Sequence, residues 1–191
     1  MRVEIHNHPH PESAMARRLT REILEAHLHC RYKGHLTWAG EPAQPSDYEV
    51  LLAGLRADVR QQVIDRIAAR QPGAAVVREA PLTAAVLKAG PAFVLDAVLE
   101  DNSSSLRFDG LMRVAGPSKL GDFHYVPMLF HGGGSVRAGQ RLLLEVYGLL
   151  LSRIQGCTPG SGIVWYGREC RANKVRLSPD PRMAESLLRE V

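Results

Sequence analysis

Two apolar segments followed by a helix-forming segment constrain the fold of this chain more than any other feature. The segment Leu106–Val114 is separated from Phe123–Phe130 by a Gly-Pro-Ser turn. The second segment is apolar on both faces apart from His124, a pattern typical of a central strand in a sheet. Three glycines end it, and a long helix is expected from about Val136 to Gln155, where Gly156 stops it.

Capping residues and apolar periodicity predict the remaining elements. They are helices over Arg21–His29, Ser46–Arg70 and Pro181–Val191, a helical turn after Thr83, and strands over Ala75–Arg78, Phe93–Leu99, Ile163–Tyr166 and Lys174–Leu177. The helix after Ser46 opens with a capping box that is completed by Glu49. Its expected buried stripe comprises Val50, Leu51, Leu55, Val59, Val63 and Ile67.

The order helix, three strands, helix, strand predicts an α/β fold with a mixed sheet flanked by helices. Residues 1–18, in which His6, His8 and His10 stand among prolines, are expected to form a loose arm ahead of a single domain over 19–191. The net charge of +4 permits a nucleic-acid partner without requiring one, because the basic residues are scattered. Three widely spaced cysteines and no membrane-spanning segment favour a cytoplasmic protein with no membrane association.

Asp109 is the carboxylate with the clearest functional placement. Alternation along a strand puts it on the face opposite the packed one, and its companions on that face are Arg107, Leu111 and Arg113. On such a polar face a metal ion or a phosphate could approach Asp109. A solvated surface aspartate beside two arginines is the alternative, and the pattern alone favours it.

From Leu19 to Leu177 the sequence resembles the RecB-like nuclease family of the PD-(D/E)XK superfamily, whose members are often fused to a helicase and an RNase H-like domain. The residues that carry the resemblance are Cys30–Lys33, Tyr48-Glu49, Phe108–Gly110, Tyr125–Pro127, Gln140–Tyr147 and Ile163–Gly167. A more distant similarity is to a CRISPR-associated nuclease with a four-cysteine iron–sulfur cluster. Cys157 and Cys170 lack that cluster's spacing, so no iron–sulfur cluster is expected here.

The resemblance implies a PD-(D/E)XK core and a set of site residues. Asp109 would be a catalytic Mg²⁺ ligand, with Gln140 and Tyr147 as catalytic residues near the DNA path and Glu49, on the first core helix, as a further metal ligand. Asp96, on the preceding strand, is the candidate for a substitute ligand. Glu145 is a weaker substitute, because it lies roughly 140° from Gln140 around the helix axis.

The chain departs from the family at the acid-x-lysine motif, where Leu129 stands at the position of the acid and His131 at that of the lysine. Leucine cannot bind a hard cation, whereas histidine can contact phosphate or act as a base. Two functions therefore remain open. The chain is either a Mg²⁺-dependent (exo)nuclease homologue in DNA processing or repair, or a catalytically inactive nuclease-fold module. Such a module would bind DNA through Arg107, Arg113 and His131, or a helicase or RNase H-like partner.

Overall fold

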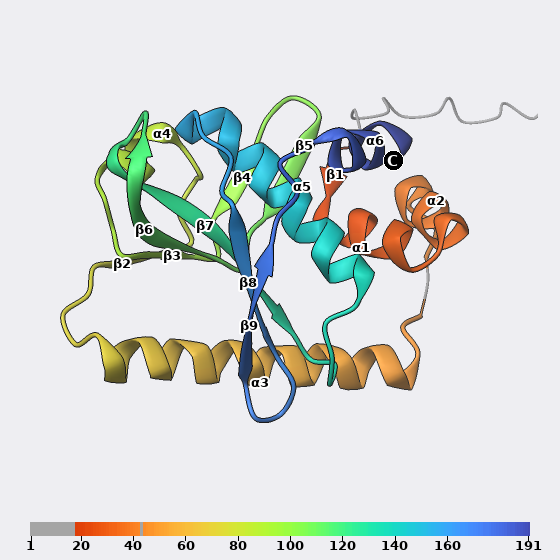
Figure 1. Cartoon of the computed structure of the whole chain (residues 1–191). Coiled ribbons are helices and arrows are strands. Elements are labelled where there is room, and N and C mark those ends of the chain that lie inside the picture. Colours follow the sequence, from red (N-terminus) through yellow and green to blue (C-terminus); the bar gives the residue numbers. More distant parts are fainter. Residues whose placement is uncertain (1–17, 43) are drawn as a thin grey trace, which may run out of the picture.

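The computed structural model describes residues 18–42 and 44–191 (Figure 1), so most of the predicted N-terminal arm lies outside the described residues. In chain order the elements are β1 (Leu19–Thr20), α1 (Arg21–His29), α2 (Arg31–Ala39), α3 (Asp47–Arg70), β2 (Val76–Arg78), α4 (Ala84–Lys88), β3 (Phe93–Leu95), β4 (Val98–Glu100), β5 (Ser104–Arg107), β6 (Gly110–Ser118), β7 (Gly121–His131), α5 (Ala138–Gln155), β8 (Ser161–Tyr166), β9 (Arg171–Arg176) and α6 (Arg182–Glu190). Except for α2, the helices were predicted from the sequence.

A six-stranded mixed sheet in the order β2-β3-β6-β7-β8-β9 organises the molecule. The two central strands, β6 and β7, are antiparallel. β7 is parallel to β8, and α5 connects these two strands in the chain. Side chains of β7 alternate between two cores: Tyr125 and Leu129 pack with α1, α5 and α6, whereas Met128 and Phe130 pack with α3. Helices therefore cover both faces of the sheet, and the predicted α/β class is confirmed.

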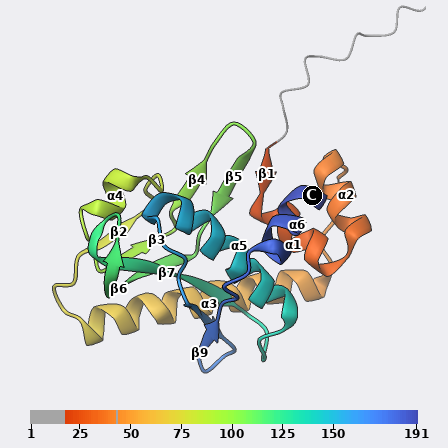
Figure 2. The same ribbon diagram turned by 45° about the horizontal axis from the view of Figure 1, so that its top comes forward.

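β3 leads into β4, and β5 leads into β6. Together they form a bent two-stranded ribbon that joins the large sheet to a small sheet of order β1-β5-β4. The predicted strands Phe93–Leu99 and Leu106–Val114 are each interrupted, at Asp96 and Asp109 respectively. The backbone of Asp96 has a positive φ of 54°, and its N–H donates to the carbonyl of Asp109 at 3.2 Å. The two aspartates thus lie opposite each other at the bend. The small sheet lies on the α5 side of the large sheet (Figure 2).

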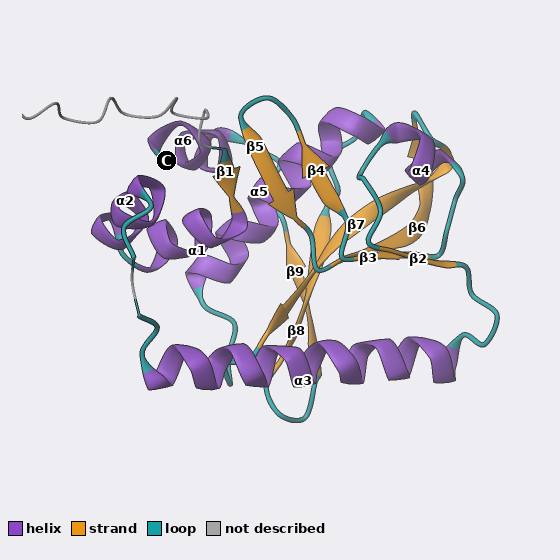
Figure 3. Ribbon diagram, turned by 180° about the vertical axis from the view of Figure 1, so that it is seen from behind, coloured by secondary structure: helices purple, strands orange, loops and turns teal. Residues whose placement is uncertain are grey.

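Only the C-terminal half of the predicted stripe on α3 is buried. Val59, Val63 and Ile67 are buried in the core, but Val50 is 57% and Leu51 is 53% exposed. The reason is that the first turns of α3 extend past the strands of the sheet (Figure 3), so they have no apolar layer to cover them. Within the described residues, no helix is long and apolar enough to cross a membrane.

Candidate functional site at Asp109

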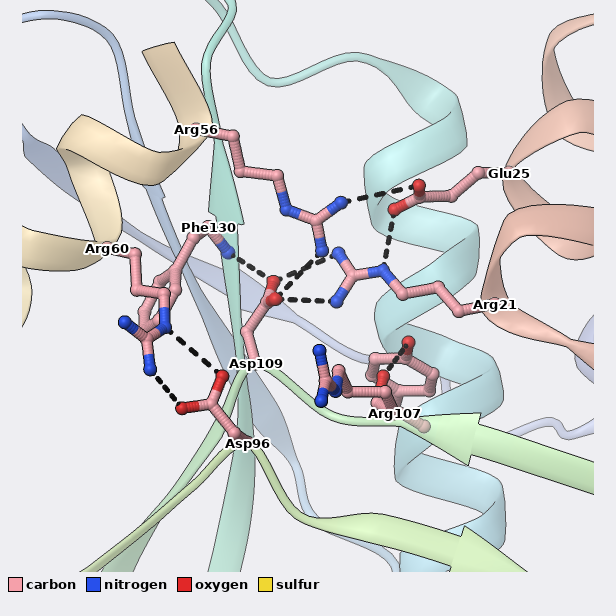
Figure 4. Close-up of polar contacts among 9 residues, drawn as sticks. Arg21, Glu25, Arg56, Arg60, Asp96, Arg107, Asp109 and Phe130 are labelled. Carbon is pink, nitrogen blue, oxygen red and sulfur yellow. Dashed lines mark hydrogen bonds and ion pairs between the residues drawn. The ribbon is translucent and has the colours of Figure 1, made fainter. Parts of the chain in front are cut away.

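The carboxylate of Asp109 is buried and receives four hydrogen bonds (Figure 4). Arg21 binds it in a bidentate manner, with Nη1 2.6 Å from Oδ1 and Nη2 3.0 Å from Oδ2. Arg56 Nη2 donates to Oδ1 at 2.8 Å, and the backbone N–H of Phe130 donates to Oδ2 at 2.6 Å. Each carboxylate oxygen offers about two lone-pair positions, so these four donors saturate the group.

Three segments far apart in sequence bring these donors together. Arg21 opens α1 directly after the N-cap Thr20, and Arg56 lies on α3. Gly132, at the end of β7, allows α3 to approach, because a Cβ there would lie 2.5 Å from the carbonyl oxygen of Leu52 and 2.9 Å from the amide nitrogen of Arg56. A side chain at this position would push α3 away from Asp109.

Two further carboxylates complete the network. Glu25, one turn after Arg21 on α1, accepts from Arg21 Nε at 2.7 Å and from Arg56 Nη1 at 3.4 Å. Asp96 is held in a bidentate pair by Arg60, one turn after Arg56, with Arg60 Nε 3.1 Å from Oδ1. Three guanidinium groups therefore meet three carboxylates, and their formal charges cancel.

Electrostatic interactions keep both Asp109 and Arg21 ionised. Burial alone would raise the pKa of Asp109, but the charges of Arg21 and Arg56 and the hydrogen bonds from Arg21 and Phe130 outweigh it and lower that pKa. Burial likewise opposes the charge on Arg21, yet Asp109 and Glu25 raise the pKa of its guanidinium. Both groups therefore stay charged over the whole physiological range.

The prediction that Asp109 lies on an open polar face of a strand is wrong. Asp109 lies at the bend between β5 and β6 and is only 5% exposed, and Leu111, its predicted neighbour on that face, is fully buried. The bend breaks the alternation on which the prediction depended. The arginines that neutralise Asp109 are Arg21 and Arg56, and neither Arg107 nor Arg113 contacts it within the described residues.

The residues around Asp109 do not fit a magnesium ion. A cation needs free oxygen lone pairs, and those of Asp109 are engaged by the four donors. Asp96, the candidate for a second ligand, is engaged by Arg60. Within residues 18–42 and 44–191, no group of three or more His, Cys, Asp or Glu side chains is arranged to hold a metal ion.

The third predicted metal ligand, Glu49, lies in a different setting. It closes the capping box of α3 by accepting from the backbone N–H of Ser46 at 2.9 Å, and it forms an ion pair with Lys33 of α2. The hydrogen bond from Lys33 lowers the pKa of the Glu49 carboxyl. Glu49 therefore caps a helix and joins α2 to α3.

The end of β7 carries Leu129 and His131, the two residues that the resemblance aligns with the acid-x-lysine motif. Leu129 is 1% exposed and belongs to the core beneath α5, so it contributes packing. Burial lowers the pKa of His131, as do the charges of Arg56 and Arg137, whereas Glu25 raises it. The imidazole therefore lies within electrostatic reach of the outer part of the Asp109 network and favours the neutral form.

The two predicted site residues on α5 lie apart from each other. Tyr147 is fully buried, stacks on Phe108 with ring centroids 4.2 Å apart, and donates its hydroxyl to the carbonyl of Arg107 at 2.7 Å. Its ring centroid lies 6.0 Å from the guanidinium carbon of Arg21, so Tyr147 supports the network from the core side. Gln140 accepts from the backbone N–H of Arg137 at 3.0 Å and so caps the start of α5.

Arg107 and Arg113 are both exposed but lie in different sheets. The guanidinium of Arg113 donates to the carbonyl of Gly90 and lies 5.4 Å from the ring centroid of Phe123. Arg107 ends β5, and its side chain forms no ion pair within the described part of the chain (Figure 4).

Sequence reasoning missed Arg21, Glu25, Arg56 and Arg60. A signal for two of them was present, since Arg56 interrupts an apolar stripe formed by Leu52, Val59 and Val63, and Arg21 shares the helix face of Leu24 and Leu28. An arginine at a core-facing position requires a buried acid as its partner. That requirement points to an acid in the core opposite both helices.

Comparison of the chain with models of known protein families gives no match, and a search of curated proteins finds no matching relative.

Proposed function

We propose that this chain is a nuclease-fold module of the PD-(D/E)XK type that has lost metal-dependent cleavage and binds nucleic acid. The proposal of the fold type is supported by the order α3, β3, β6, β7, α5, β8, which is the helix, three-strand, helix, strand order of that core. Parallel pairing of β7 with β8 across α5 agrees with it.

The observation that carries the loss of cleavage is the saturation of Asp109 by Arg21, Arg56 and the Phe130 N–H. In a metal-dependent nuclease, two carboxylates hold the ion that stabilises charge on the phosphate. Here two guanidinium groups occupy the positions around the central carboxylate, and Leu129 replaces the second acid. Arginine still offers planar, charged donors for phosphate, so binding can persist without hydrolysis.

Fluorescence anisotropy with labelled single- and double-stranded oligonucleotides tests nucleic-acid binding. We expect the affinity to fall steeply with salt, by roughly 0.7–0.9 log units per phosphate contact for each log unit of salt. Arg107→Glu should weaken binding and reduce that slope by about 1. Arg78→Glu, at an exposed position on β2, is the matched control and should change neither quantity beyond the effect of net charge.

The same oligonucleotides test for cleavage in Mg²⁺ and Mn²⁺, and we expect none. Cleavage by the wild type that Asp109→Ala abolishes would contradict the loss of catalysis. An absence of binding at low salt would contradict the nucleic-acid role.

A protein partner is the second candidate function, and exposed apolar side chains at one end of the molecule favour it. Tyr32, Tyr48, Val50 and Leu51 are each more than half exposed. The ion pair between Lys33 and Glu49 joins the two helices that carry them, α2 and α3. Large apolar side chains exposed on neighbouring helices favour association with another protein.

A further inference from the structure

We infer that Arg21 and Arg56 form an anion-binding site whose internal occupant is the carboxylate of Glu25, and that a phosphodiester group displaces Glu25 from it. The chemical class of the ligand rests on the proposed nucleic-acid function. The site itself rests on the geometry of the two guanidinium groups, which hold a carboxylate at the rim of the Asp109 network (Figure 4).

The hydrogen-bond donors of this site are already oriented before a ligand binds. Arg21 is 3% exposed and is locked by two hydrogen bonds to Asp109, which leaves its Nε pointing at Glu25 at 2.7 Å. Arg56 is held by Asp109 through Nη2 and presents Nη1 to Glu25. Donors that are already oriented lose little conformational entropy when they bind a ligand.

Glu25 is the member of the network that can leave. Its side chain is 39% exposed, against 7% for that of Asp109, and its bond to Arg56 is long at 3.4 Å. Both of its hydrogen bonds go to the two arginines, so a rotation of the side chain into water breaks no other hydrogen bond or ion pair within the described residues. Asp109, in contrast, cannot turn away without breaking its hydrogen bonds with two arginines and an N–H.

The charge of the site matches one phosphodiester. With Glu25 in place, three arginines balance three carboxylates; with Glu25 turned outward, the site carries one positive charge. A phosphodiester carries one negative charge, and its two free oxygens accept hydrogen bonds from guanidinium groups as a carboxylate does. His131 lies within electrostatic reach of Glu25 and Arg56.

The decisive comparison is Glu25→Gln against Asp180→Asn. Asp180 also pairs with an arginine, Arg182, and its loss changes the net charge equally without touching the network. Glu25→Gln removes the negative charge that competes for the two arginines and should tighten oligonucleotide binding roughly fivefold. Asp180→Asn should leave the affinity within about twofold of wild type, and adding Arg56→Gln should abolish the gain from Glu25→Gln.

The wild-type protein gives an independent readout that does not depend on how a variant folds. The arginine Nε–H signals of ¹⁵N-labelled protein are followed while inorganic phosphate or a short oligonucleotide is added. Displacement of Glu25 predicts a saturable shift of the Arg21 Nε–H signal with either probe, and thermal unfolding checks that each variant is folded.

The outcomes separate this inference from the proposed function. If the oligonucleotide binds but Glu25→Gln and Asp180→Asn behave alike and the Arg21 signal stays fixed, the anion site is overturned while nucleic-acid binding stands. If phosphate shifts the Arg21 signal and the oligonucleotide does not bind, the anion site stands and the nucleic-acid role fails. A gain in affinity for Glu25→Gln that requires Arg56 supports both.

Discussion

Asp109 and Glu49 both form ion pairs with basic side chains, but their surroundings give them different structural roles. Asp109 is buried at the bend of a ribbon and receives four hydrogen bonds from three segments. Glu49 lies at the exposed start of α3, where it accepts from Ser46 and Lys33. The same chemical group therefore joins three parts of the core at one place and caps a helix at the other.

Asp96 lies between these extremes. It shares the ribbon bend with Asp109 and is also buried, but it has a single arginine partner, Arg60, whose side chain is 36% exposed. The contribution of a carboxylate to the stability of the fold therefore depends on how many buried charges it neutralises. Removing Asp109 takes the buried partner from Arg21, which is itself buried, whereas Arg60 and Lys33 are exposed enough to turn to water.

The largest effect is expected from Asp109→Asn. It removes the buried counter-charge of Arg21 and leaves only the partly exposed carboxylate of Glu25 beside that guanidinium, and loss of one partner of a buried ion pair costs about 3–5 kcal/mol. Urea unfolding at neutral pH measures the free energy of unfolding, with Asp65→Asn on the exposed face of α3 as the control. A loss no greater than that of the control would show that the network does not hold the core together.

Acid should weaken the same network. Because the pKa of Asp109 is lowered in the folded protein, the unfolded chain takes up its proton first as the pH falls. The contribution of Asp109 is therefore complete well above the unfolded value of about 3.9 and is lost as the pH falls below it towards the folded pKa. Urea unfolding between about pH 7 and 3 should show a flatter profile for Asp109→Asn than for wild type, and parallel profiles would contradict this.

Asp96→Asn should cost less, about 1 kcal/mol, since its pair with Arg60 is partly screened by solvent. Asparagine also tolerates the positive φ of this position, so the substitution isolates the charge from the backbone. The same urea titration measures it. A loss as large as that of Asp109→Asn would erase the distinction between the two aspartates of the bend.

Glu49→Gln should have the smallest effect on stability. Glutamine keeps the hydrogen bond to the Ser46 N–H and loses only an exposed ion pair. We expect its thermal midpoint to stay close to that of wild type, with Ser46→Ala, which removes the cap itself, falling further. A larger loss for Glu49→Gln than for Ser46→Ala would mean that the ion pair with Lys33 outweighs the cap.

The sequence predicted the elements well because capping residues and apolar periodicity are local signals. The capping box of Ser46 and Glu49 and the cap at Thr20 are both present. Local alternation failed at Asp109, because the ribbon bends there to enter a second sheet. The bend depends on contacts with Arg21 and Arg56, which are 88 and 53 residues away in the chain.

The candidate site was therefore only partly predictable. Asp109 could be singled out from its neighbours, but its partners come from helices whose docking no local pattern specifies. The predicted burial of the whole stripe on α3 was wrong for a related reason. Periodicity places Val50 on the apolar face of the helix, but it does not show that the sheet ends before reaching this residue.

A Mn²⁺ titration followed by electron paramagnetic resonance tests the central claim most directly, namely that Arg21, Arg56 and the Phe130 N–H engage the Asp109 carboxylate in place of a metal ion. We predict that wild type and Asp109→Asn deplete the signal of free Mn²⁺ equally and only weakly, because Asp109 has no free lone pair to offer. A tight stoichiometric site in wild type that disappears in Asp109→Asn, with the variant shown to be folded, would contradict the account.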